Sequence, residues 1–210
     1  MKRSFIREIL ESIDENTISF AGGLPSENLF PKEDLKTAAV KIFDNPKAFQ
    51  YGLSNGIPEL REKIASRYTK EGFPTAKENI LITTGSQQAM YILAKFYESK
   101  DITIEEPSYL GAMNIFRLNH LKMHGIKLEK DGINIKDFKE SFKNTKLTYL
   151  IPDFQNPSAT TYCDEKRKEI AKIVSEENGI LIEDSPYSEL FFDKKNISIS
   201  SKILKNYFNW

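Results

Sequence analysis

The sequence predicts an α/β fold in which helices flank a mostly parallel sheet, and three observations support this. From about residue 50, short apolar runs typical of buried strands alternate with segments whose apolar residues recur at helical spacing. Glycine and proline separate many of these segments. There is no internal repeat and no low-complexity linker. Strands separated by helices favour βαβ units, which build parallel sheets covered on both faces.

The first residues predict an arm rather than part of a core. A short amphipathic segment at residues 4–10 is followed by SFAGGLPSENLFP at residues 19–31, where glycines and prolines are expected to exclude regular structure. We therefore expect residues 1–45 to form an N-terminal arm and small-domain segment. Residues 46–210 are expected to form the larger α/β domain.

The elements of this larger domain are expected in a definite order. Pro58 can begin a helix that Gly72 follows, with Leu60, Ile64 and Tyr68 on one face. The predicted strands are residues 79–83 (NILIT), 101–106 (DITIEE), 125–130 (GIKLEK), 146–153 (KLTYLIPD) and 179–184 (GILIED). Further helices are predicted from Ala89, Leu93 and Phe96, after the first strand, and from Ile170, Ile173 and Val174, before Gly179.

Composition indicates a small partner. The chain has 210 residues, of which 40% are hydrophobic, so it can bury a substantial core. Its 30 basic and 30 acidic side chains cancel, and no basic run marks a nucleic-acid or anionic membrane surface. No segment resembles a signal peptide or an apolar membrane span. The single cysteine, Cys163, excludes an intrachain disulfide, and a reducing cytoplasm is the expected location.

Polar residues follow the predicted strands. Gly85 and Ser86 lie between a strand and a helix, where free N–H groups and the helix dipole can bind a phosphate. The segment lacks G-x-G-x-x-G and the G-K-[ST] ending, so it suggests neither a dinucleotide nor a nucleoside triphosphate. The alternative is that Ser86 only caps its helix.

The next strand ends offer other groups. Tyr109 could lie over a planar ligand, or simply pack. Asn156 is held extended by Pro157 and could direct its amide to the same edge, or only mark a turn. Asp184, followed by Tyr187, ends the last predicted strand, where the alternative is a solvated acid opening a turn. Together these groups describe a flat, phosphorylated, heteroaromatic ligand at the carboxyl edge of the sheet.

Six motifs in order make the chain resemble fold-type I pyridoxal-phosphate aminotransferases, in the subgroup with 2-aminoadipate and multi-substrate aminotransferases. These motifs are ISFAGGLPSENLFP, YGLSNGIPELRE, ITTGSQQA, EEPSY, DFQNPSATTY and IEDSPYSELFF. The resemblance implies an aminotransferase-type large domain that is incomplete at the C-terminus, with residues 46–210 as a partial cofactor-binding domain. It also implies pyridoxal 5'-phosphate as cofactor, amino acid and 2-oxo acid substrates, and no metal.

The resemblance assigns roles to individual residues. Asp184 matches the acid that pairs with the pyridine nitrogen, which keeps the ring an electron sink. Asn156 and Tyr187 match the pair that hydrogen-bonds the ring's 3-oxygen, and Tyr109 matches the aromatic stacked on the ring. The phosphate turn corresponds to Gly85, Ser86 and Gln87. Glu183 should face the other side of its strand and be structural.

Three further matches concern the substrate and a second subunit. Tyr51 matches a tyrosine that reaches the neighbouring subunit's cofactor phosphate, which implies a homodimer in the full-length form. Gly23 matches an arm residue lining the substrate pocket, where Asn156 also lies. Arg7 matches a position that in some relatives approaches the substrate's side chain, although an arginine on an amphipathic helix is more often a solvated charge.

The other candidate residues are expected to be structural. His120 and His124 fall near the end of a predicted helix, without a surrounding arrangement of cysteines or acids, and are expected to be at the surface or partly packed. Cys163 precedes a helix and has no recognisable base partner, so it is expected to be structural.

The chain departs from the family at its end. Relatives have a lysine that forms the Schiff base after the strand that NYFNW (206–210) would begin, and a C-terminal domain with an arginine for the substrate carboxylate. Lys202 and Lys205 precede that strand, so the Schiff-base lysine is expected not to be in this chain, which alone is expected to be inactive. Alternatives left open are a lyase or decarboxylase on the same fold, the effector domain of a transcription regulator, and an inactive truncated remnant.

Overall fold

The computed structural model describes residue 14 and residues 16–18, 25–70, 72–97, 99–190 and 207–209. The contacts of the chain divide it into two compact units, Met1–Gly52 and Leu53–Trp210. Each unit is described by itself. The assignment of an arm with a small-domain segment and of a partial cofactor-binding domain stays a prediction.

The first unit contains the helix α2 (Lys32–Phe43) between two short 3-10 turns, η1 (Glu27–Leu29) and η2 (Pro46–Phe49). The sequence analysis named no helix here. It was also wrong to exclude regular structure from the whole of residues 19–31, since η1 lies within them. Acidic residues in the first turn of α2 and Lys41 in its last turn suit the helix dipole.

The second unit is built on a sheet with the strand order β3-β2-β1-β4-β5-β6. The bounds of these strands are β1 Asp101–Glu106, β2 Lys122–Glu129, β3 Gly132–Ile133, β4 Leu147–Leu150, β5 Ile180–Glu183 and β6 Tyr207–Asn209. Only the pair β2·β3 is antiparallel among the described pairs. The predicted α/β class with a mostly parallel sheet is therefore confirmed.

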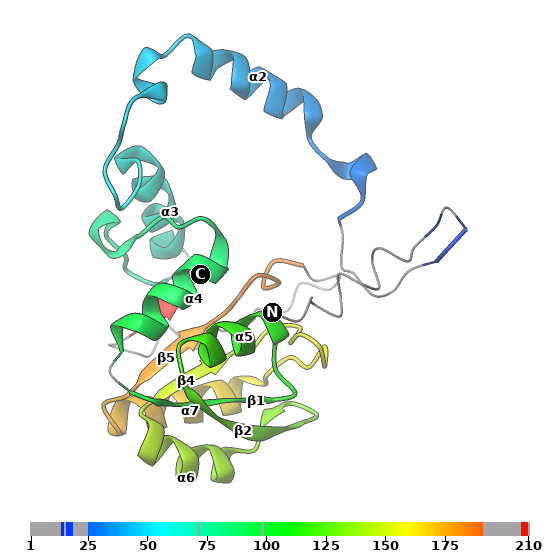
Figure 1. Ribbon diagram of the computed structural model, residues 1–210, viewed down its shortest axis with the longest axis vertical. Coiled ribbons are helices and arrows are strands. Elements are labelled where there is room, and N and C mark those ends of the chain that lie inside the picture. Colours follow the sequence, from blue (N-terminus) through cyan, green and yellow to red (C-terminus); the bar gives the residue numbers. More distant parts are fainter. Residues whose placement is uncertain are drawn as a thin grey trace. The chain divides into compact units, whose positions relative to one another are not determined.

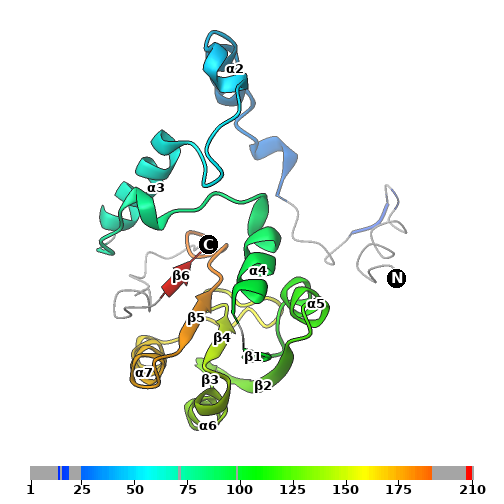
Figure 2. The ribbon, with the colours of Figure 1, turned by 60° about the vertical axis from the view of Figure 1, so that its left-hand side comes forward.

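Helices cover both faces of this sheet (Figures 1 and 2). The helices of the unit are α3 Pro58–Lys70, α4 Gly85–Phe96, α5 Leu110–Leu118, α6 Ile135–Thr145 and α7 Asp164–Glu176, with the 3-10 turn η3 Lys77–Asn79. One core cluster joins the sheet to Met90 of α4 and Phe116 of α5. A second joins the opposite face to Phe138 of α6 and Val174 of α7. Alternate residues of β4 and β5 belong to the two clusters, as strand geometry requires.

The strand predicted at residues 79–83 is wrong. Residues 77–79 form η3, and Ile80 is extended but belongs to no strand. The backbone N–H of Ile82 instead donates to Asn55 O at 3.1 Å. The segment has the extended conformation that its apolar residues favour, but no described strand runs beside it to form a ladder.

Two other local expectations need correction. His124 lies within β2 rather than near a helix end, and its Nε2 is 2.6 Å from Asp101 Oδ1, so it does have an acidic neighbour. His120 follows α5 with a φ of 62°. The helix α7 ends at Glu176, and Asn178 rather than Gly179 takes the left-handed conformation after it, with a φ of 49°.

Candidate functional site

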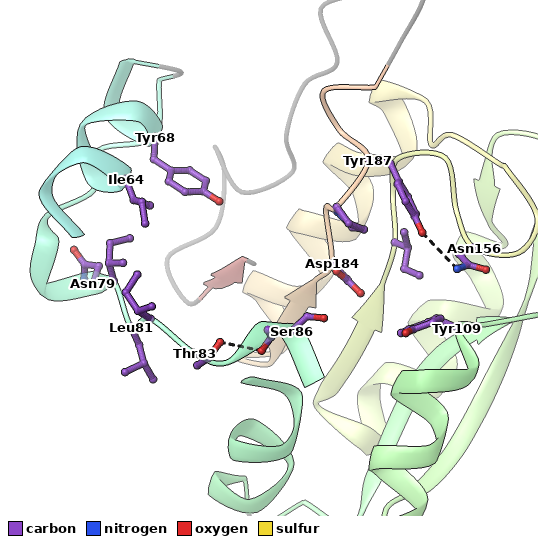
Figure 3. A pocket seen from close by; sticks show the side chains of 15 residues that line it. Ile64, Tyr68, Asn79, Leu81, Thr83, Ser86, Tyr109, Asn156, Asp184 and Tyr187 are labelled. Atoms are coloured by element: carbon purple, nitrogen blue, oxygen red, sulfur yellow. Dashed lines mark hydrogen bonds between the residues drawn. The ribbon is translucent and has the colours of Figure 1, made fainter. Parts of the chain in front are cut away.

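A cavity of about 600 Å³ opens at the carboxyl end of β5 and the N-terminus of α4, entirely within the second unit (Figure 3). It is lined by six of the residues predicted from the sequence: Gly85, Ser86, Tyr109, Asn156, Asp184 and Tyr187. These residues come from four segments that are separate in the sequence. Three of these segments follow β1, β4 and β5, whose carboxyl ends meet at one edge of the sheet, and the fourth is the N-terminus of α4.

Asp184 is the buried acid of this cavity. It follows β5, its N–H donates to Leu150 O at 2.9 Å, and its side chain projects toward the cavity in Figure 3. The Tyr149 hydroxyl donates to Asp184 Oδ2 at 2.6 Å. Burial raises the pKa of Asp184, and the hydrogen bond from Tyr149 opposes that rise. Among the described residues, none donates a hydrogen bond to Oδ1. Oδ2 of Asp184 is thus fixed by Tyr149, while Oδ1 is available to a ligand.

Tyr149 was missed by the sequence analysis. Burial and the charge of Asp184 raise the pKa of the Tyr149 hydroxyl far above its ordinary value, so it remains a hydrogen-bond donor. The only signal was position, since Tyr149 lies in the strand next to Asp184 and pairs with Ile182 in the parallel register. An adjacent strand residue of the same face is a candidate partner for an acid at a strand end.

A polar pair and an aromatic ring line another part of the cavity. The Asn156 amide donates to the Tyr187 hydroxyl at 3.5 Å, as Figure 3 shows. Both groups are partly buried, and together they can hold a single ligand oxygen. Tyr109 precedes α5 and packs on the first core cluster while still lining the cavity.

The N-terminus of α4 lies at the cavity, where Gly85 and Ser86 line it. Gly85 has a φ of 74°, which a side chain would strain, and its turn is closed by hydrogen bonds between Thr83 and Gly85. The first N–H groups of an α-helix have no partner inside the helix, and the dipole there attracts negative charge. Ser86 and Gln87 are exposed at this end. Gln87, in contrast to Gly85 and Ser86, does not line the cavity.

The opposite wall of the cavity comes from α3 and the segment after it. Ile64 and Tyr68, predicted on an apolar helix face, line the cavity, and so does Leu81 of the segment predicted as a strand. Figure 3 shows Tyr68 directed toward the open space. These apolar groups make the cavity suitable for a ligand with a hydrocarbon portion.

The remaining predicted residues do not join this group. Tyr51 belongs to the first unit and is exposed, so its position relative to the cavity is not described. Gly23, Arg7, Lys202 and Lys205 lie outside the described residues. Glu183 is buried among side chains of α7 on the other face of the sheet, as predicted.

No metal site is present in the part of the chain that the structure describes, because no three potential ligands cluster there. Cys163 precedes α7, with its Sγ 3.7 Å from Asp131 Oδ2. None of the described helices is long and apolar enough to cross a bilayer.

The fold and the cavity define an α/β protein with a cavity at the carboxyl edge of a mostly parallel sheet. A family model described as "Aminotransferase class I and II" matches residues 16–207. The chain belongs to this family, which uses pyridoxal 5'-phosphate.

Named relatives agree with this assignment. The 2-aminoadipate transaminase of Thermus thermophilus is 34% identical over 204 residues, which cover 94% of this chain and 50% of the relative. Aromatic-amino-acid aminotransferase 1 of Thermococcus litoralis is 32% identical over 204 residues, which cover 90% of this chain and 49% of the relative. The crystal structure of Pyrococcus horikoshii kynurenine aminotransferase superposes with a TM-score of 0.88 at 30% identity, covering 100% of this chain and 55% of that one. The chain thus spans about half the length of these curated relatives.

Proposed function

We propose that this chain is the cofactor-binding part of an aminotransferase that moves an amino group between an amino acid and a 2-oxo acid. The observation that carries the proposal is the Asp184 carboxylate, buried at a strand end with Oδ2 held by Tyr149 and Oδ1 available at the cavity. This arrangement fits a cationic ring N–H, since such a donor gives the carboxylate a charge-assisted hydrogen bond. Family membership and the helix N-terminus beside the cavity support the same ligand.

Pyridoxal 5'-phosphate, when bound, supplies an aldehyde that takes up the amino group and a ring that accepts electrons released at the substrate carbon. In this proposal Asp184 keeps the proton on the ring nitrogen, and Tyr149 orients Asp184. Asn156 and Tyr187 would hold the 3-oxygen of the ring, and Tyr109 would pack against the ring. Gly85, Ser86 and Gln87, at the N-terminus of α4, would hold the phosphate.

The finer parts of the proposal concern substrate and assembly. Gly23, Arg7 and Asn156 are proposed to line the substrate pocket. A homodimer is proposed in which Tyr51 reaches the cofactor phosphate of the other subunit. A cytoplasmic location is also proposed, and the single cysteine, Cys163, is compatible with it.

Binding of pyridoxamine 5'-phosphate to the 210-residue chain at pH 8, measured by calorimetry, tests this proposal. This compound carries the ring nitrogen, the 3-oxygen and the phosphate but no aldehyde, so it cannot react with surface lysines. Asp184→Asn is expected to weaken its binding by about 10- to 100-fold, as loss of a hydrogen bond to a charged group does. Binding of inorganic phosphate should be unchanged, because the helix N-terminus is intact.

Glu106→Gln is the matched control, because Glu106 is an exposed acid outside the cavity. It is expected to bind pyridoxamine 5'-phosphate like the wild type. Equal binding by the wild type and Asp184→Asn, or no binding at millimolar ligand, would contradict the proposed site.

Covalent attachment is a separate question. Incubation with pyridoxal 5'-phosphate, borohydride reduction and peptide mapping are expected to show no single lysine labelled stoichiometrically, because Lys202 and Lys205 precede the strand that the family lysine follows. Stoichiometric labelling of one lysine, with transamination of an amino acid, would show that the catalytic lysine has been misplaced.

A further inference from the structure

The buried acid Glu105 lies behind the cavity, on the opposite face of β1 from the first core cluster. It is 1% exposed, and three donors surround it. Its Oε1 accepts from the Ile151 N–H at 2.9 Å and from the Tyr162 hydroxyl at 2.7 Å, and its Oε2 accepts from the Gln155 amide at 2.9 Å. Both oxygens of the carboxylate are therefore occupied by the loop that follows β4.

Hydrogen bonds also fix both polar ends of the Gln155 side chain. It is 1% exposed, and its Nε2 donates to Pro107 O at 2.8 Å in addition to Glu105. Its Oε1 accepts from the Ser158 N–H at 2.8 Å. Its backbone N–H donates to Thr160 O at 2.9 Å. Side chain and backbone thus fix this residue within its loop and against the end of β1.

These two residues join the segments that carry cavity groups. Asn156 directly follows Gln155, and Tyr109 lies two residues after Pro107. Among the described residues, every hydrogen bond between residues 105–109 and residues 151–162 involves Glu105 or Gln155. The spacing between Tyr109 and Asn156 therefore depends on this pair.

We propose that Glu105 and Gln155 are positioning residues, which set Tyr109 and Asn156 at the separation needed to pack on the cofactor ring and to reach its 3-oxygen. The proposal rests on the proposed function for the identity of the ligand. Neither residue lines the cavity, so the pair acts through the residues it holds. A carboxylate buried among three donors on the far side of a ligand site is a costly feature, and support of binding groups explains its presence.

The experiment compares Glu105→Gln, Gln155→Glu and the double variant that exchanges the two residues. Glu105→Gln sets two amide NH₂ groups against each other, and Gln155→Glu sets two carboxylates against each other. The exchange restores a donor facing an acceptor and keeps acceptors for the Ile151, Tyr162 and Ser158 donors. The bond to Pro107 O is lost, because a carboxylate oxygen at position 155 then faces that carbonyl oxygen.

Thr103→Val is the control for loss of stability. Thr103 is buried on the same face of β1, and its hydroxyl bonds Ser141 and Thr145 of α6, away from the loop. The variant loses buried hydrogen bonds of comparable number without disturbing residues 151–162.

Two readouts are measured at pH 8. At least a 10-fold loss of affinity for pyridoxamine 5'-phosphate is expected for each single variant, a typical effect of removing a group that orients a binding residue. The exchange should recover most of that loss, while affinity for inorganic phosphate stays constant throughout. Amide hydrogen exchange in residues 151–162 should accelerate about 10-fold in the single variants and not in Thr103→Val.

The outcomes separate the two proposals. Failure of the wild type to bind pyridoxamine 5'-phosphate overturns the proposed function and this inference with it. A wild type that binds, with single variants that bind equally well or an exchange that recovers nothing, overturns this inference alone.

Discussion

The substitution Glu105→Gln is predicted to remove a pH dependence from the stability of the fold. Two effects act on the Glu105 carboxyl group in opposite directions. Burial disfavours the charged form, while the hydrogen bonds from Gln155, Ile151 and Tyr162 favour it. Burial is the larger effect and raises the pKa of Glu105 to about 7, from 4.5 for an ordinary glutamate.

The size and sign of the effect follow from this shift. The folded chain binds the Glu105 proton more tightly than the unfolded chain does. The resulting stabilisation is fully present below pH 4.5 and is lost as the pH rises through about 7. A shift of about 2.5 units corresponds to about 3 kcal/mol, at 1.36 kcal/mol per unit. The free energy of unfolding of the wild type, relative to Glu105→Gln, should therefore fall by about 3 kcal/mol between pH 4.5 and pH 8.

Urea unfolding of both proteins across this range measures the difference directly. Glu106→Gln, which removes a similar charge from an exposed neighbour, should follow the wild-type curve. Parallel curves for the wild type and Glu105→Gln would refute the reasoning, because they would mean that the three donors outweigh burial and keep Glu105 ionised throughout.

Two further predictions concern other buried groups. Tyr149→Phe removes the hydrogen bond that lowers the pKa of Asp184, so Asp184 should become protonated at a higher pH than in the wild type. On acidification, the variant should therefore lose binding of pyridoxamine 5'-phosphate at a higher pH. Calorimetry from pH 8 down to pH 5 measures the pH at which binding is lost, and the same pH in both proteins would contradict the prediction. Arg167→Met should cost about 3–5 kcal/mol in urea unfolding, because it leaves the fully buried Asp153 carboxylate without its ion pair. Lys172→Met, which removes the exposed ion pair with Glu176, should lower the free energy of unfolding by less than about 1 kcal/mol. Equal losses of stability in Lys172→Met and Arg167→Met would contradict the effect assigned to the buried charge.

The parts of the fold that could be predicted are those whose sequence pattern has one structural solution. Residues 101–106 carry isoleucines at alternate positions and form β1, while residues 179–184 contain a short apolar run and include β5. Residues 79–83 show the same pattern without forming a strand, because a strand also requires a neighbour, which a single segment does not reveal. The two-residue strand β3 is too short to give any periodic signal.

Residues that line the cavity could be predicted from the sequence, whereas Glu105, which holds cavity residues in place, could not. A polar residue just after an apolar strand lies at the sheet edge whatever the details of packing, so Asp184 and Tyr109 could be placed from the sequence. Glu105 and Glu106 are adjacent acids in one strand, and the sequence alone does not show which is buried. The register decides it: Thr103 pairs with Thr148 across to β4, which sets Glu105 beside the Ile151 N–H while Glu106 is exposed. Because successive strand residues face opposite sides, a shift of one residue in this register would bury Glu106 in place of Glu105. Support of the site therefore depends on long-range strand pairing, and that pairing has no signature in local sequence.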